Sequence, residues 1–87
     1  MFVLHIDLFQ AADAEESYAI RIQNDPVIRA QRGLGGDLKK VWSVDFESED
    51  APDLERIDWD ELLDRTVEAW TLSDPVVSGV NWREFAR

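Results

Sequence analysis

The sequence predicts an α+β domain of the ferredoxin-like β-α-β-β-α-β type, an antiparallel sheet with two helices on one face. Three observations lead to this class. Apolar residues alternate at the start of the chain, a well-capped amphipathic helix lies in the C-terminal half, and glycines separate two strand-like segments between them. The 87 residues suit a single domain, 1–87, with a modest core. Because the chain has no cysteine, disulfides and thiolate metal sites are excluded.

The first element is a predicted strand over Phe2–Phe9, where apolar side chains recur at every second residue. The next segment, Asp13–Asp25, carries two opposing signals. Asp13 followed by Glu16 forms a capping box and Pro26 would end a helix, which favours a helix over 14–24. Residues 18–23 alternate like a strand, and this second interpretation stays open.

Two further strands are expected over Val27–Arg32 and Leu38–Glu47. Residues 33–37, Gly-Leu-Gly-Gly-Asp, would join them as a hairpin loop, because glycines supply positive φ angles. The spacing of these glycines does not match a dinucleotide-binding loop, which needs glycine where Leu38 stands.

A helix beginning after Asp58 is the clearest element. Asp58 is placed to cap it, Glu61 to complete a capping box, and Ile57 to contact Leu62 across the first turn. Apolar residues then follow helical spacing up to residue 70, and the helix should end before Pro75. A last strand over Val76–Val80 and a terminal helical turn over 81–87 complete the prediction.

The net charge of −10 is concentrated in one stretch: residues 45–64 hold ten acids against a single arginine, Arg56. Direct binding to nucleic acid or to an anionic membrane is disfavoured, because both require a basic surface. Basic protein partners are favoured, since opposite charges accelerate encounter. No apolar run is long enough to span a bilayer, and a cytoplasmic location is expected.

The sequence predicts no catalytic residue, no metal site and no cofactor. The single histidine, His5, has Asp7 as its neighbour on the same strand face, and such a pair could serve acid–base chemistry. A structural pair at a sheet face or a dimer interface is the favoured interpretation. The acids of residues 45–64 do not follow the spacing of a calcium loop in either register that starts at Asp53 or Asp58.

The favoured function is a non-catalytic acidic protein that inhibits a basic, nucleic-acid-binding partner by mimicking or blocking its nucleic-acid site. Carboxylates at helical spacing approximate the charge density of a phosphate backbone. By size and charge, the chain is similar to small anti-CRISPR and anti-restriction proteins of phages. The predicted partner-binding residues are Glu47, Glu49, Asp50, Asp53, Asp60, Asp64, Glu68 and Trp82; Trp82 is included because tryptophan is a frequent interface anchor, with closure of the core as its alternative role.

Two alternatives remain. Residues 13–30, and especially Ile-Gln-Asn-Asp-Pro-Val at 22–27, resemble the helix-to-strand stretch of YCII-related proteins. That resemblance implies a dimeric α+β barrel protein that could act as a small enzyme, with Val3, His5, Asp7 and Phe9 lining a homodimer interface or pocket. An immunity protein or antitoxin would also use acids against a basic toxin.

Overall fold

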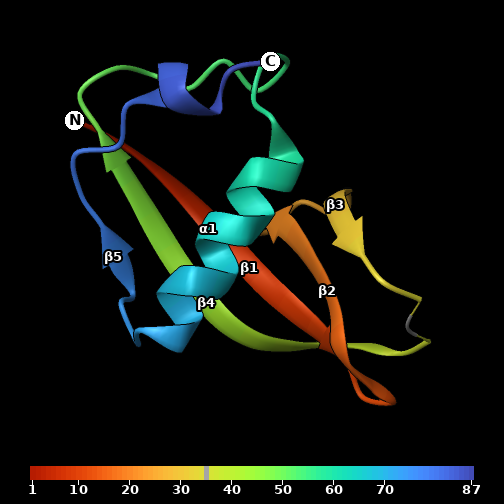
Figure 1. Ribbon diagram of the computed structural model, residues 1–87. Coiled ribbons are helices and arrows are strands. Elements are labelled where there is room, and N and C mark those ends of the chain that lie inside the picture. Colours follow the sequence, from red (N-terminus) through yellow and green to blue (C-terminus); the bar gives the residue numbers. More distant parts are fainter. Residues whose placement is uncertain (35) are drawn as a thin grey trace.

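The computed structural model describes residues 1–34 and 36–87, and these form a mixed five-stranded sheet with one α-helix (Figure 1). The strands are β1 (Phe2–Ala11), β2 (Ala14–Ile22), β3 (Ile28–Arg32), β4 (Leu38–Ser48) and β5 (Val76–Val77); the helix is α1 (Trp59–Thr71), and a 3-10 helix, η1 (Trp82–Phe85), follows β5. The spatial order is β3-β2-β1-β4-β5. All neighbouring strands are antiparallel except β4 and β5, which are parallel and are connected through α1.

The ferredoxin-like prediction is wrong, because the described residues form one α-helix instead of two and the expected hairpin does not exist. β3 pairs with β2, and β4 pairs along its length with β1, from Phe2 opposite Ser48 to Ala11 opposite Leu38. The segment over 33–37 therefore links strands on opposite sides of the β1–β2 pair. Residue 35 of that predicted loop lies outside the described residues.

The predicted helix over 14–24 is strand β2. Its alternating residues are buried on both faces of the sheet: Ile20 lies in the core, and Ser17 and Ala19 are buried on the opposite face. The acids at the two ends of this segment make hydrogen bonds in loops instead of capping a helix. Asp13 accepts a hydrogen bond from the Gly36 amide at 3.4 Å, and Asp25 accepts one from the Val27 amide at 3.0 Å, which holds the pKa of Asp25 below its ordinary value. Tertiary pairing thus outweighs a local helix signal.

This result also removes the structural basis of the YCII-like alternative, since the residues that resemble a helix-to-strand stretch run from β2 through a turn into β3. The segment is a second strand of an antiparallel meander, whose exit is shaped by Asn24 at a φ of +66°.

The core lies between α1 and the face of the sheet that α1 covers (Figure 1). Alternate residues of β1 and β4 point toward the helix, among them Ile6, Leu8 and Phe46, and α1 contributes Leu62 and Leu63. The strand alternation read from the sequence over 2–9 is confirmed, since these core residues of β1 are spaced by two.

The helix start is confirmed, because the Asp58 side chain accepts hydrogen bonds from the amides of Asp60 and Glu61 at 3.1 and 3.3 Å. The second half of the predicted capping box is replaced: the Asp58 amide donates to the carbonyl of Phe85, at the end of η1. The predicted terminal helical turn is η1, and the last strand is shorter than expected.

Candidate functional site

Most of the predicted partner-binding acids lie in or beside the loop over 49–58, which runs from β4 to α1 along one end of the molecule (Figure 1). Ser48 anchors its beginning. The buried Ser48 hydroxyl donates to the Asp50 carbonyl at 2.6 Å and accepts a hydrogen bond from the Trp82 indole N–H at 2.7 Å. Asp53 then turns the chain, because its carboxylate accepts a hydrogen bond from the Glu55 amide at 3.1 Å.

The C-terminal segment is bound to this loop through the backbone. Ile57 and Ala86 form an antiparallel bridge, and the Arg87 amide donates to the Arg56 carbonyl at 2.7 Å. Together with the Asp58–Phe85 hydrogen bond, these contacts hold η1 beside the start of α1. Residues distant in sequence therefore form one surface.

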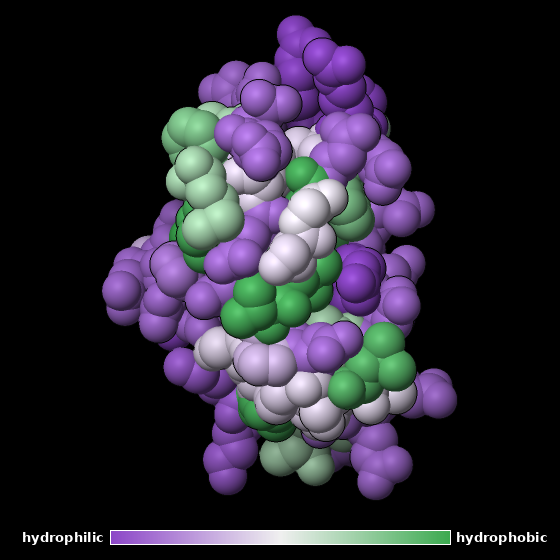
Figure 2. All heavy atoms as spheres, turned by 90° about the vertical axis from the view of Figure 1, so that its left-hand side faces the viewer, coloured by the Kyte–Doolittle hydropathy of each residue, from purple (hydrophilic) through white to green (hydrophobic). Residues whose placement is uncertain are grey.

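We call this surface the acidic end. It comprises eight acids, Glu49, Asp50, Asp53, Glu55, Asp58, Asp60, Glu61 and Glu84, together with Arg56, Arg83 and Arg87. Among the described residues, one ion pair joins an acid to an arginine of this set, Asp53 to Arg56 at 3.5 Å between side-chain atoms that are both largely exposed. Because all of these acids except the half-buried Asp58 are exposed, the excess of negative charge faces solvent, and hydrophilic residues predominate at this end, at the top of Figure 2.

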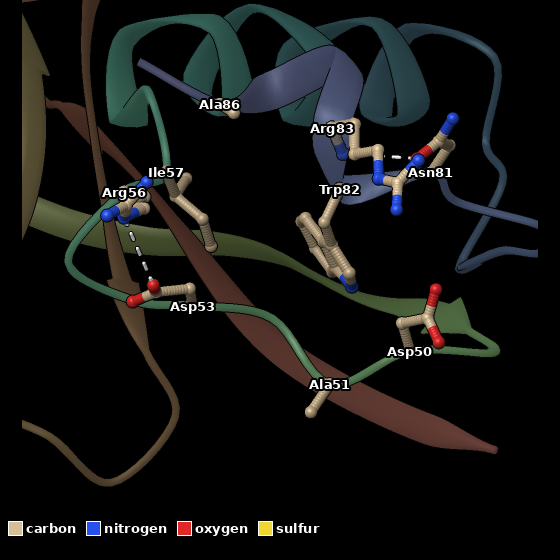
Figure 3. A pocket seen from close by; sticks show the side chains of 9 residues that line it. All are labelled: Asp50, Ala51, Asp53, Arg56, Ile57, Asn81, Trp82, Arg83 and Ala86. Carbon is tan, nitrogen blue, oxygen red and sulfur yellow. Dashed lines mark hydrogen bonds and ion pairs between the residues drawn. The ribbon is translucent and has the colours of Figure 1, made fainter.

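A cleft of about 470 Å³ opens between the loop and η1 (Figure 3). The Trp82 side chain extends from η1 into the space between the two segments, with Asp50 on one side and Ile57 and Asp53 on the other (Figure 3). Trp82 is 9% exposed, because its ring packs against Phe46 and Phe85. The tryptophan predicted as a partner anchor is thus mainly a core residue that forms a wall of the cleft.

The structure divides the predicted site. Glu49, Asp50, Asp53 and Trp82 line this cleft or the smaller hollow next to it. Asp60 is exposed on the first turn of α1, and Glu47 accepts a hydrogen bond from the Ser78 hydroxyl at 3.0 Å, farther along β4.

The stripe Asp60–Asp64–Glu68 does not act as one charged ridge. Asp64 forms an ion pair with Arg32 of β3, and Glu68 lies 3.7 Å from Arg65. Both of these acids are therefore partly neutralised within the chain, and Asp60 belongs with the acidic end.

Sequence reasoning missed Glu55, Glu61 and Glu84, all of which are exposed at the acidic end. The sequence assigns Glu61 to the capping box, but the Asp58 amide donates to the Phe85 carbonyl instead of to the Glu61 side chain. Glu84 could have been included only if the return of the C-terminal segment to the loop had been predicted.

A second polar cluster lies on the side of the sheet away from α1, which we call the open face; it carries Val3, His5, Asp7 and Phe9 of β1. His5 pairs with Asp45 of β4, with 2.6 Å between Nδ1 and Oδ1, and not with Asp7 as the strand spacing suggested. The Asp7 carboxylate is 1% exposed. It accepts hydrogen bonds from Ser43 at 2.9 Å and from Arg21 at 3.2 Å.

Within residues 1–34 and 36–87, no three histidine or carboxylate side chains are grouped so that they could hold a metal ion. No helix in this described part is long and apolar enough to cross a membrane. A scan against models of protein families and searches of curated proteins and of solved structures each found no match for the chain.

Proposed function

We propose that this chain is a non-catalytic binding protein that inhibits a basic protein partner by occupying the surface on which that partner binds nucleic acid. The observation that carries the proposal is the acidic end, where eight acids and three arginines from the loop, α1 and η1 share one surface. A surface that binds nucleic acid presents lysines and arginines to phosphates, and exposed carboxylates offer the same cations an alternative set of anions.

The arrangement of the acids supports this function better than their number does. Glu49, Asp50 and Glu55 are exposed on a loop held at its start by the Ser48–Asp50 hydrogen bond and at its end by the Asp58–Phe85 hydrogen bond, so that little ordering of the backbone is needed when a partner binds. Among the described residues none of these three acids forms an ion pair, unlike Asp64 of α1, which pairs with Arg32 of β3, and their charges can steer a basic partner toward this end.

The proposal is tested by reversing charge at the acidic end and, as a matched control, elsewhere. Glu49→Lys/Asp50→Lys/Asp60→Lys changes the net charge as much as Glu15→Lys/Glu16→Lys/Asp74→Lys, which alters exposed acids outside the acidic end. Wild-type and variant chains would serve as bait in native-host lysate at about 0.1 M and about 0.5 M salt, conditions that differ about twofold in screening length.

We expect the wild-type chain and the control variant to capture the same partner at low salt, and the acidic-end variant to lose it by at least about tenfold. In a mobility-shift assay, the wild-type chain should release nucleic acid from the captured partner. Equal capture by both variants would overturn the role of the acidic end. A captured toxin with no nucleic-acid ligand would retain the binding role and refute inhibition at a nucleic-acid site.

A further inference from the structure

We propose that the open face of the sheet binds a second copy of this chain in a symmetric, face-to-face dimer. This inference is independent of the acidic end and goes beyond the function proposed above. α1 covers one face of the sheet (Figure 1), while the described residues place no helix over the other. Val3 on that uncovered face is 38% exposed, and Phe9 is half-buried beneath Arg21.

The charge of the open face is close to balanced, with three acids against two bases, whereas the acidic end has eight acids against three arginines. Asp7, Asp45 and Glu47 are offset by Arg21 and Lys40, with His5 paired to Asp45. A second acidic chain with a net charge of −10 meets less repulsion here than at the acidic end.

The charges on the open face are also separated along the strands. Glu47 lies opposite Val3, and Lys40 lies opposite Phe9, six residues farther along β1. The open face is thus negatively charged beside Val3 and positively charged beside Phe9. Glu47 and Lys40 of β4 lie on the same side of the sheet, because each pairs with a β1 residue, Val3 or Phe9, that belongs to the open face.

Consider a two-fold axis that lies between two such faces, parallel to both sheets and perpendicular to their strands. Rotation about this axis places the strands of the two copies in opposite directions. Glu47 of each chain would then meet Lys40 of its partner, and Val3 would meet Phe9. Sheets pack face to face with their strands within about 30° of alignment, which this arrangement satisfies. Because a two-fold interface uses one patch twice, a single chain must carry both members of every pair, as this face does.

The test is sedimentation velocity from about 5 µM to about 500 µM, where a weak symmetric dimer would form. The wild-type mass should rise toward twice 10.0 kDa across the series. Glu47→Lys would place a lysine opposite the partner's Lys40, and dimerisation should weaken by at least about tenfold. The control Asp74→Lys makes the same change in net charge at an exposed site between α1 and β5 and should dimerise at least as well as wild type.

Adding Lys40→Glu to Glu47→Lys restores an opposite-charge pair in reverse and should recover dimerisation to within about threefold of wild type. Lys40 also lies 3.7 Å from the buried Asp7, so circular dichroism must show that the double variant folds. Where it does not fold, Val3→Lys takes its place and should weaken dimerisation. A monomer at every concentration, or a dimer that Glu47→Lys leaves unchanged, would overturn the proposal, as would a folded double variant without recovery.

Discussion

Gly33 is the residue at which backbone conformation and packing act together. Its φ of +81° belongs to the left-handed region, and a Cβ atom there would stand 2.4 Å from the Ser17 hydroxyl and 3.1 Å from the Ser17 Cα. Ser17 is buried in β2 and cannot move aside without shifting the strand. The glycine is therefore required twice, once by its angle and once by its neighbour.

Gly79 provides a control for this argument. Its φ is +68°, but a Cβ atom there would meet nothing within 4 Å. Gly79→Ala should lower the free energy of unfolding by about 1 kcal/mol through backbone strain alone. Gly33→Ala should lower the free energy of unfolding by about 1 kcal/mol more than Gly79→Ala does, because of the clash with Ser17. Equal losses in urea denaturation would show that the Ser17 contact is unimportant.

At the scale of elements, the start of α1 tests which hydrogen bonds hold it. Asp58→Ala should lower the free energy of unfolding by about 1 kcal/mol, because two amides of the first turn lose their acceptor. Glu61→Ala should have an effect below about 0.5 kcal/mol, since the Asp58 amide donates to Phe85 instead of to Glu61. If Glu61→Ala lowered the free energy of unfolding as much as Asp58→Ala, the capping box predicted from the sequence would be supported after all.

Elements with their own local pattern could be predicted from the sequence, and elements defined by distant partners could not. The alternation over 2–9 and the helix after Asp58 are written into neighbouring residues, and both are confirmed. β2 has the same kind of alternation, but Asp13 and Pro26 compete with it locally. Only pairing with β1 and β3 together decides for a strand.

The candidate site shows the same division. The acids of the loop could be identified because they adjoin one another in sequence. The ion pair of Asp64 with Arg32 and the burial of Trp82 against Phe46 depend on strand order, which no local signal contains. The prediction from sequence therefore overestimated the free charge of the Asp60–Asp64–Glu68 stripe and the exposure of Trp82, and it did not include Glu84.

For the molecule as a whole, the net charge of −10 opposes folding, because the compact state brings like charges together. The ion pairs outside the Asp7 cluster are at least a quarter exposed on both sides, and such pairs contribute little. Raising NaCl from about 10 mM to about 500 mM should screen the repulsion more than it weakens these pairs. Thermal denaturation should then shift upward by a few degrees, about 3–6 °C. A lower melting temperature at high salt would mean that the exposed ion pairs dominate.

Because β1 lies in the middle of the sheet, the molecule should resist a force applied at its N-terminus more strongly than one applied at its C-terminus. Tension applied at Met1 has to shear β1 from β4 along a ladder from Phe2 to Ala11, and from β2 along a ladder from Ile6 to Ala11. Tension applied at Arg87 meets the backbone hydrogen bond to Arg56, the single bridge at Ala86, the Asp58–Phe85 hydrogen bond and the buried Trp82 in turn, before it reaches the two residues of β5. Pulled from that side, the chain would open its acidic end long before the sheet yields.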